Sequence, residues 1–410
     1  MAITITDIEH ARATLRGVIH PTPMLPDDRL GAELGVRVVY KAENTQRSGS
    51  FKLRGAYNKI NSLNADERQR GVVAHSAGNH AQGVALAAQL LGIPATIVMP
   101  EHAPLTKVMS TRHYGAEVIL AGESFDEAGA TAYEIQRARS LTFVHAFNDD
   151  LVIAGQGTIG LEVAEALPEL TTMIVPVGGG GLISGIATAL RALLPNVRII
   201  GVQSAACAPV QASLAAGEPI TWPTANTIAD GIAVKRPGDK TLPIIKKLVD
   251  EIVTVNDDEI CRAIAYCAQS VRLVVEGAGA AGLAALIAGK VALKPGDVVC
   301  PLLCGGNIDG NLLARVIEQA LLKQGRYILL RTTVGDRPGN LAPLISHVAA
   351  IGANVIDIIH RRAVWLGPID RVGIEMILEV RDEEHGQSVL KYLGDTGYLV
   401  ERGGNRAWPG

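Results

Sequence analysis

The sequence predicts a two-lobed α/β protein followed by a smaller α+β domain, and three observations support this fold class. The chain has 410 residues, of which 48% are hydrophobic but only 4% aromatic, and it contains 44 glycines. Aliphatic, glycine-rich segments of this kind are typical of parallel α/β sheets. Short apolar runs alternate with helical stretches in two arrays, and the pattern changes after about residue 323. A chain of this length is expected to form two or three domains.

The first array of alternating elements begins after Gly71. Strands are predicted at 72–75, 95–99 and 116–120, and helices at 79–92, at 104–115 and from about Ser124. Gly92 and Gly115 would end two of these helices. Strands separated by single helices form right-handed βαβ units, so this region is expected to contain a parallel sheet.

The same alternation resumes downstream of residue 170. Strands are predicted at 173–177, 197–203, 251–255 and 297–302, with helices between them and a last helix reaching about Lys323. Two such arrays suggest two lobes, with a ligand cleft at the carboxyl ends of the strands. We therefore expect residues 1–323 to form one domain, with a small lobe at about 44–150 inserted in a large lobe.

The C-terminal region, residues 326–410, has a different pattern. Strands are predicted at 326–334, 354–364, 371–380 and 398–402, with a turn and helix at 336–353 and a second helix at 383–397. This βαββαβ order predicts a ferredoxin-like α+β domain.

Charge and cysteine content exclude several classes of protein. The net charge is −3, so no basic surplus indicates a nucleic acid or an anionic membrane as partner. The cysteines are odd in number and form no C-x-x-C pair, so neither a disulfide framework nor a metal site is expected; they are Cys207, Cys261, Cys267, Cys300 and Cys304. The uncharged stretch 170–190 is broken by Pro176 and four glycines, and residues 1–17 lack an apolar signal segment. A cytoplasmic location is expected.

A run of four glycines provides the strongest local signal. Gly178, Gly179, Gly180 and Gly181 precede Leu182, between a predicted strand and a predicted helix. Consecutive glycines leave the backbone N–H groups unobstructed at a helix N-terminus, which favours binding of a phosphate group. An ordinary turn would need only one or two glycines. No Gly-Lys-Ser/Thr follows, so the loop is not of the Walker type.

A second glycine pattern, G-A-G-A-A-G at 277–282, matches the spacing of a dinucleotide-binding fingerprint. The acidic residue at the required distance, Asp297, lies in a turn before its strand rather than at the end of one. Close packing of a helix against its neighbours is therefore the preferred interpretation, and a nicotinamide-dependent oxidoreductase stays open as an alternative function.

Three further segments carry candidate functional residues. Lys52 lies in S-G-S-F-K-L-R-G-A, next to Phe51 and small residues, where burial would lower its pKa and make the amine a competent nucleophile. The segment Ser76-Ala77-Gly78-Asn79-His80 precedes a helix and could bind a carboxylate through backbone N–H groups, although an ordinary helix cap is possible. Cys304-Gly305-Gly306-Asn307 follows another strand.

Together, these four segments resemble the fold type II pyridoxal-phosphate enzymes, and most closely the threonine dehydratases, also called threonine ammonia-lyases. The motifs are S-G-S-F-K-L-R-G-A, S-A-G-N-H-A-Q-G-V-A, G-G-G-G-L-I-S-G and C-G-G-N, in this order within residues 1–323. The resemblance implies a fold similar to that of the tryptophan synthase β chain. The C-terminal segment resembles an ACT domain, an amino-acid-sensing module.

The resemblance implies pyridoxal 5'-phosphate as cofactor and a role for each matching residue. Lys52 would bind the cofactor covalently and remove the α-proton of the substrate. Asn79 would bind the pyridoxal hydroxyl, and Cys304 would approach the pyridine nitrogen. The implied cofactor-binding residues are Phe51, Lys52, Asn79, Gly178, Gly179, Gly180, Gly181, Leu182 and Cys304. The substrate carboxylate would be bound by backbone or side-chain groups of Ser76, Gly78 and His80.

The implied reaction is the conversion of L-threonine to 2-oxobutanoate and ammonia, with L-serine reacting in the same way to give pyruvate. Serine racemases of this fold carry a second serine in the asparagine loop, where this chain has Ala77. One-sided proton transfer therefore favours elimination over racemisation. Those relatives also bind a divalent cation through acidic residues, but the matching positions here are Gln203 and Pro209, so no such metal is expected.

Other functions stay open on the sequence alone. A serine or hydroxyaspartate dehydratase or a serine racemase would use the same residues, and an inactive amino-acid sensor would need only the C-terminal domain. Pairing of ACT domains in a homodimer or homotetramer is expected. An amino-acid effector, with isoleucine expected for a biosynthetic enzyme, would bind near Asp336, Gly339, Gly352 and Asn354.

Overall fold

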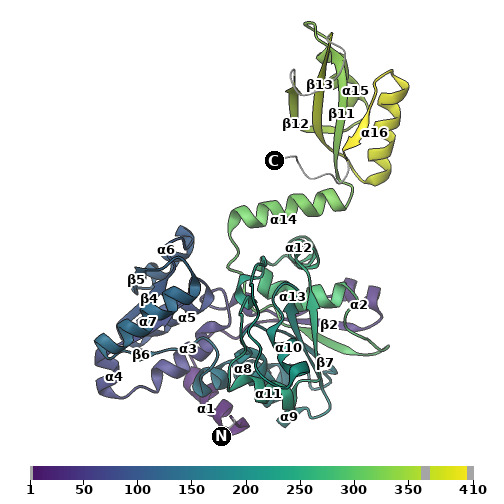
Figure 1. Ribbon diagram of the computed structural model, residues 1–410. Coiled ribbons are helices and arrows are strands. Elements are labelled where there is room, and N and C mark those ends of the chain that lie inside the picture. The colour runs from purple at the N-terminus through teal and green to yellow at the C-terminus, as the bar shows by residue number, and fades with distance from the viewer. Residues whose placement is uncertain (1–2, 362–369, 404–410) are drawn as a thin grey trace. The chain divides into compact units, whose positions relative to one another are not determined.

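The computed structural model of the protein describes residues 3–361 and 370–403. The chain divides into two compact units, Met1–Gly310 and Asn311–Gly410 (Figure 1). Helix α14 (Gly310–Lys323) therefore belongs almost entirely to the second unit, whereas the sequence pattern places it at the end of the first.

The larger sheet of the first unit has six strands in the order β1-β2-β10-β7-β8-β9. Only β1 runs antiparallel to its neighbour, and the other strands are parallel. The residues of β7 and β10 are all buried, because helices cover both faces of a sheet of this kind. The strand bounds are β1 (Met24–Pro26), β2 (Arg37–Lys41), β7 (Thr172–Pro176), β8 (Arg198–Ser204), β9 (Glu251–Val255) and β10 (Val298–Pro301).

The smaller sheet of the first unit is entirely parallel, with the order β5-β4-β3-β6. It consists of β3 (Val72–His75), β4 (Ala95–Met99), β5 (Glu117–Leu120) and β6 (Thr142–Phe143). Helices α5 (Asn79–Leu91), α6 (Leu105–His113) and α7 (Phe125–Arg139) connect its strands, as Figure 1 shows. The predicted alternation of strands and helices is confirmed here, and Ser124 caps α7 by accepting a hydrogen bond from the Glu127 N–H.

The helices of the larger lobe alternate with its strands as predicted. Further helices occur where the hydrophobic pattern of the sequence is weaker. The elements are α8 (Asp150–Ala166), α9 (Gly181–Leu193), α10 (Pro209–Ala216), α11 (Thr241–Leu248), α12 (Asp257–Tyr266) and α13 (Gly277–Ile287), with a π-helical turn at Cys267–Val271. The G-A-G-A-A-G segment lies inside α13, and no strand precedes it directly. It therefore lacks the strand-to-helix loop that a dinucleotide fingerprint requires.

The first 70 residues contain elements that the sequence pattern did not predict. They are α1 (Ile5–Leu15), α2 (Asp28–Leu34), α4 (Ala65–Arg70) and the strands β1 and β2. The helix α3 (Lys52–Asn61) begins at Lys52, where a junction between a loop and a helix is expected. Local signals exist, since Thr4 and Asp7 form a capping box at α1 and Asn64 and Glu67 form one at α4. The short length of β1 and β2 explains why the alternation is not visible there.

A buried charge network fixes α3 against the core of the first unit. The Arg54 side chain is fully buried and donates to both carboxylate oxygens of Glu43, at 2.9 and 2.8 Å. It also pairs with Glu162 of α8, which pairs in turn with Lys41 of β2 at 2.6 Å. Two cations and two carboxylates balance each other, so burial leaves no uncompensated charge. The network holds the helix that begins at Lys52.

The second unit contains an antiparallel sheet with the order β12-β13-β11-β14, flanked by helices. Its elements are β11 (Tyr327–Gly335), α15 (Leu341–Ala350), β12 (Asn354–Arg361), β13 (Arg371–Glu379), α16 (Glu383–Asp395) and β14 (Glu401–Gly403). Alternate residues of β11 are buried, as expected for a sheet with one covered face. The predicted ferredoxin-like fold is confirmed, although the end of the strand predicted at 354–364 lies outside the described residues.

Among the helices of residues 3–361 and 370–403, none combines the length and the apolar composition that crossing a bilayer requires.

Candidate active site

The four motif loops of the first unit lie at the ends of strands and helices, and hydrogen bonds join two of them directly. The Phe51 N–H donates to the Cys304 carbonyl at 3.2 Å, and the Gly306 N–H donates to the Gly49 carbonyl at 2.9 Å. Ser50 and Gly305 form an isolated antiparallel bridge. The lysine loop and the cysteine loop therefore form one continuous surface, although more than 250 residues separate them in the sequence.

Lys52 is the first residue of α3, and its amine has few polar partners. Its Nζ lies 3.3 Å from the Ala146 carbonyl oxygen and 5.0 Å from the centre of the Phe51 ring. Burial lowers the pKa of Lys52 to about 8, against opposing effects of Cys304 and Glu276. A substantial fraction of the amine is therefore unprotonated near neutral pH, as a nucleophile or proton acceptor requires.

The glycine loop connects β7 to α9 and packs closely against Phe147. A Cβ atom on Gly179 would lie 2.4 Å from the Phe147 ring, and one on Gly181 would lie 2.8 Å from the Phe147 Cβ. Gly180 has a φ of +96°, which favours glycine. Because Phe147 follows Ala146, adjacent residues contact the glycine loop and the Lys52 amine, which brings these two parts of the site together.

The backbone N–H groups of the glycine loop are available to bind an anion. Among the described residues, no hydrogen bond is donated by the N–H groups of Gly178 to Leu182, while the Gly179 carbonyl accepts from Thr241 Oγ1 at 2.6 Å and from the Gly238 N–H at 3.2 Å. Hydrogen bonds to a carbonyl group thus fix the loop, while its N–H groups, at the N-terminus of α9, stay available. This arrangement fits a phosphate group.

Asn79 begins α5 and is held at both edges of its carboxamide. Its Nδ2 donates to Glu276 Oε1 at 2.5 Å, and its Oδ1 accepts from Asn307 Nδ2 at 2.8 Å. Asn307 also donates to the Ser48 carbonyl at 2.8 Å. Asn79 is thereby tied to both the lysine loop and the cysteine loop.

Cys304 lies just beyond β10, is 3% exposed and has a free thiol. Burial, with a smaller contribution from Glu276, raises its pKa far above the ordinary value for a thiol. The side chain is therefore a neutral thiol at any physiological pH, which can form only weak hydrogen bonds.

The three expected substrate-binding residues differ in what they can offer. The imidazole of His80 is buried, and its Nε2 lies 2.8 Å from the Val144 carbonyl oxygen, so this ring nitrogen is already engaged. Burial lowers the pKa of His80 to about 3. Ser76 Oγ accepts a hydrogen bond from the Gly78 N–H at 3.1 Å. What remains for a carboxylate is the free backbone N–H groups of the first turn of α5, including that of His80.

Sequence reasoning missed Glu276, Phe147 and the interaction of Asn307. Asn307 is part of the C-G-G-N motif, so its residue type was visible but its partner was not. Phe147 and Glu276 carry no local signal, because only the folded chain brings them to the loops. The small residues of α13 also contribute, since a Cβ on Gly279 would lie 2.2 Å from the Gly305 carbonyl oxygen. The pattern at 277–282 thus serves close packing against the cysteine loop.

The expected effector residues lie at the two ends of α15. Asp336 and Gly339 precede this helix, and Gly352 and Asn354 follow it. A ten-residue helix is about 15 Å long, so the two turns are not adjacent in one domain. Asn354 Nδ2 donates to Glu379 of β13 at 3.4 Å. A single ligand site that uses both turns would need a second copy of the domain.

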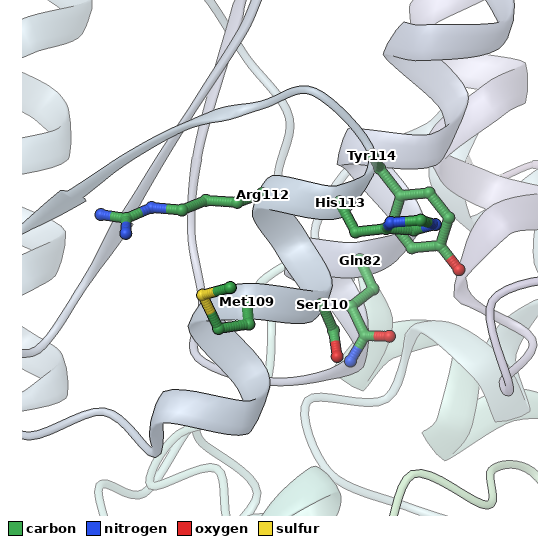
Figure 2. A pocket seen from close by; sticks show the side chains of 6 residues that line it. All are labelled: Gln82, Met109, Ser110, Arg112, His113 and Tyr114. Carbon is green, nitrogen blue, oxygen red and sulfur yellow. The ribbon is translucent and has the colours of Figure 1, made fainter.

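A separate cavity of about 590 Å³ opens beside α6, outside the motif loops. Figure 2 shows the side chains of Gln82 and Ser110 extending in the same direction and Arg112 extending away from them. The lining residues are Gln82, Met109, Ser110, Arg112, His113 and Tyr114. None of the residues predicted for the site lines this cavity.

The search for metal ligands covered residues 3–361 and 370–403 and found no cluster of three or more histidine, cysteine, aspartate or glutamate side chains. The Gln203 side chain, at one position where relatives are expected to hold a cation, is buried, and its Oε1 accepts a hydrogen bond from the Gln211 N–H at 3.0 Å. None of the described cysteines forms a disulfide.

The residues present fit pyridoxal phosphate on independent grounds. A buried loop with free N–H groups suits the phosphate, and a lysine with a lowered pKa suits the aldehyde. Asn79 offers one remaining N–H to the ring hydroxyl, and Cys304 offers a neutral thiol.

Comparison with known proteins agrees with this fit. The model of the family described as "Pyridoxal-phosphate dependent enzyme" matches residues 15–305. An L-threonine ammonia-lyase of Thermotoga maritima is 50% identical over 398 residues, covering 97% of this chain and 99% of that protein.

Two solved structures are similar to the chain as well. The processed form of threonine deaminase isoform 2 from Solanum lycopersicum has a TM-score of 0.74 and 38% identity, covering 77% of this chain and 88% of that one. Maize serine racemase has a TM-score of 0.74 and 37% identity, covering 79% of this chain and 99% of that one. The chain belongs to the pyridoxal-phosphate dependent enzymes of fold type II, and the resemblance to the threonine ammonia-lyases that its motifs carry is confirmed.

Proposed function

We propose that this enzyme converts L-threonine to 2-oxobutanoate and ammonia. The observation that carries the proposal is the partly buried amine of Lys52, with its pKa of about 8, beside the glycine loop and Asn79. The L-threonine ammonia-lyase of Thermotoga maritima supports the substrate, because the match extends over nearly the whole of both chains.

Bound pyridoxal phosphate supplies an electron-withdrawing ring that acidifies the Cα–H of an attached amino acid. The chain's own residues do the rest. The N–H groups of Gly178 to Leu182 bind the phosphate and fix the position of the ring. The Lys52 amine accepts the Cα proton at Nζ, which its lowered pKa permits at neutral pH. The proton that Lys52 removes from Cα balances the one that the departing β-hydroxyl takes up, so the hydroxyl leaves as water. The released 2-aminocrotonate then hydrolyses to 2-oxobutanoate and ammonia.

The substrate carboxylate binds at the N-terminus of α5. The N–H groups of Asn79, His80 and Ala81 there have no acceptor among the described residues, and the helix terminus adds partial positive charge. These backbone groups, rather than the His80 ring, provide this site, because that ring is engaged with Val144. The N–H groups of Ser76 and Gly78 already donate, to the Val98 carbonyl and to Ser76 Oγ. Binding the carboxylate in this place turns the Cα–H toward Lys52.

The neutral thiol of Cys304 and the side chain of Ala77 favour elimination over racemisation. A thiol whose pKa is far above its ordinary value does not hold a proton on the pyridine nitrogen as an aspartate would, so prompt loss of the hydroxyl is favoured over a long-lived carbanion. Ala77 provides no proton donor on the opposite face, so a proton removed from one face is not replaced from the other.

The decisive experiment measures the release of 2-oxo acid from L-threonine and from L-serine by the purified protein. We expect release from both, with chiral analysis of residual serine showing no D-serine. A product spectrum dominated by D-serine would support a racemase, and activity confined to serine or hydroxyaspartate would support a different dehydratase.

Lys52→Ala tests the role of the lysine, and Lys59→Ala on the same helix is the matched control. Lys59 forms an ion pair with Asp149 at 2.8 Å and lies outside the motif at 48–56. We expect Lys52→Ala to lose both the visible absorbance of the bound cofactor and 2-oxo acid release, and Lys59→Ala to keep both. Full activity in Lys52→Ala would contradict the proposal.

The C-terminal ferredoxin-like domain supports amino-acid regulation of the enzyme. Pairing of two such domains in a homodimer or homotetramer would bring the turn at Asp336–Gly339 of one copy near Gly352 and Asn354 of another, which one domain alone does not do. We expect isoleucine or valine to change the activity of the full chain. A chain ending at Lys323 that kept both full activity and an unchanged effector response would contradict this regulation.

A further inference from the structure

Glu276 is a buried carboxyl group for which the proposed reaction has so far given no role. It directly precedes α13 and is 5% exposed, yet its side chain does not cap the helix. In the described part of the chain it forms no salt bridge, and its hydrogen bond is the one from Asn79 Nδ2 at 2.5 Å. A carboxylate buried without a cation is costly, so its presence beside the motif loops calls for a function.

Charged groups of both signs surround Glu276. The negative charge of Asp230 and the positive charges of Lys107 and Lys52 act on Glu276, and Glu276 in turn acts on the Cys304 thiol. Burial, together with Asp230, raises the pKa of Glu276 to about 7, while Asn79, Lys107 and Lys52 oppose this shift. The carboxyl group therefore exchanges its proton near the pH at which the enzyme works.

The shape of the cysteine loop also provides space for this carboxylate. A Cβ on Gly305 would lie 2.2 Å from Glu276 Oε1 and 3.0 Å from Asn79 Nδ2. The same residue bonds the loop to α13, because the Glu276 N–H donates to the Gly305 carbonyl at 3.1 Å. The position of the carboxylate relative to Asn79 is therefore fixed by backbone contacts.

The partners of Asn79 determine which way its carboxamide faces. The ionised form of Glu276 can only accept hydrogen bonds, and the NH₂ group of Asn79 is the edge that faces it. The other edge, Oδ1, accepts from Asn307 Nδ2 at 2.8 Å. One hydrogen bond thus fixes Oδ1, and one N–H of Nδ2 is left over, so Asn79 can donate to a ligand.

We propose that Glu276 is a positioning residue that holds Asn79 with its free N–H toward the ring hydroxyl of the cofactor. This inference rests on the proposed function, because it assumes that Asn79 lies at that hydroxyl. Donation from Asn79 stabilises the ionised hydroxyl, and the orientation of the amide fixes the tilt of the ring relative to Lys52. Without Glu276, the carboxamide would lose the partner that determines its orientation.

The test compares Glu276→Ala, Glu276→Gln and Asn307→Ala with the wild-type holoenzyme, and uses Glu134→Gln on the exposed surface of α7 as control. The readouts are the visible absorbance of the bound cofactor against pH, the dissociation constant for pyridoxal phosphate, and kcat and KM for threonine. For Glu276→Ala we expect a shifted absorbance band, weaker cofactor binding and a fall in kcat of about 10- to 100-fold with little change in KM.

Glu276→Gln separates positioning from charge. Its amide oxygen can still accept from Asn79, so we expect the band position to be kept. Since the negative charge of Glu276 raises the pKa of Lys52, its removal should move the acid limb of the kcat profile to lower pH. Asn307→Ala frees the opposite edge of Asn79 and should shift the band as Glu276→Ala does. Glu134→Gln should match the wild type.

The proposal is overturned if Glu276→Ala retains the wild-type absorbance, cofactor affinity and kcat. Should that variant fail to fold by circular dichroism, Asn307→Ala decides, and an unshifted band there overturns the proposal as well. A wild-type holoenzyme that binds the cofactor but releases no 2-oxo acid from threonine would contradict the proposed substrate. The spectral comparison between variants would still test the role of Glu276.

Discussion

Three motif-loop glycines of the first unit, here called the catalytic unit, differ in their surroundings from the two glycines of the predicted effector turns. A Cβ on Gly49, Gly179 or Gly305 would lie within 2.4 Å of another side chain, whereas Gly339 and Gly352 have open space around the same position. The C-terminal glycines instead have φ values of +94° and +78°. Glycine thus provides close packing around the cofactor site but only backbone conformation in the C-terminal turns.

The charged side chains of the two units also differ, in their burial. The Arg54 network of the catalytic unit is buried and fully paired, while the Arg402–Glu383 pair of the C-terminal domain lies at the surface, with side-chain exposures of 37% and 47%. We therefore expect the catalytic unit to tolerate little change at its loops, and the C-terminal domain to tolerate change at its surface without loss of fold.

The largest expected effect is that of removing the buried guanidinium. Arg54→Met leaves Glu43 and Glu162 without their main counter-charge, which should lower the free energy of unfolding by about 3–5 kcal/mol. Urea unfolding followed by the absorbance of the bound cofactor measures this loss. Arg402→Met is the control, since an exposed ion pair contributes little, and equal losses in the two variants would abolish the contrast.

The next effect concerns the reactivity of Lys52. Its pKa of about 8, against an ordinary 10.5, makes the amine about 100-fold more available at pH 8 than an unperturbed lysine. The rate of cofactor uptake by the apo-enzyme should therefore rise through a midpoint near pH 8. A midpoint above pH 10 would show that burial does not act on this amine.

The same shift of the Lys52 pKa has a consequence for stability. Between pH 8 and 10.5 the unfolded chain binds more protons at Lys52 than the folded state does, so this residue makes the free energy of unfolding rise with pH across that window.

A smaller effect is expected for the glycine loop. Gly179→Ala places a methyl group against the Phe147 ring and should cost about 1–3 kcal/mol of stability together with cofactor affinity. Titration of the apo-enzyme with pyridoxal phosphate measures the affinity. The double variant Gly179→Ala/Phe147→Ala should recover part of it; no recovery would show that the loop conformation, not the contact, is at fault.

The smallest effect is expected in the C-terminal domain. Gly339→Ala meets no neighbouring atom, so it carries only the strain of a left-handed backbone, about 1 kcal/mol. Differential scanning calorimetry of the full chain should show a slightly lower transition for this domain and unchanged basal activity. A loss of basal activity would break the comparison.

The site residues could be predicted from the sequence motifs more completely than the helices and strands that lie between the motifs. Lys52, Asn79, the glycine loop and Cys304 could be named because glycines and polar residues at strand ends form contiguous signals. Elements in the first 70 residues were not predicted, because β1 and β2 are only three and five residues long. The helix α14 follows its hydrophobic pattern, but no local signal shows which unit it packs against.

Long-range partners were beyond prediction for a different reason. The Glu276–Asn79 bond joins residues 197 positions apart, and the contact of Phe147 with Gly179 depends on the packing of two lobes. Nothing in the sequence near Glu276 distinguishes it from a surface glutamate. The same limit applies to His80, whose motif suggests an available imidazole, whereas the fold directs its Nε2 to Val144.

The bond between Asn307 and Ser48 spans 259 positions, which places the closure of the site late in protein synthesis. A ribosome must have released β10 and the residues after it before the lysine loop can meet its partner, so a nascent chain carries its motifs unpaired for most of translation. Closing so long a loop costs conformational entropy that only the completed sheet offsets. Cofactor can then stabilise only a catalytic unit that has been synthesised beyond residue 307.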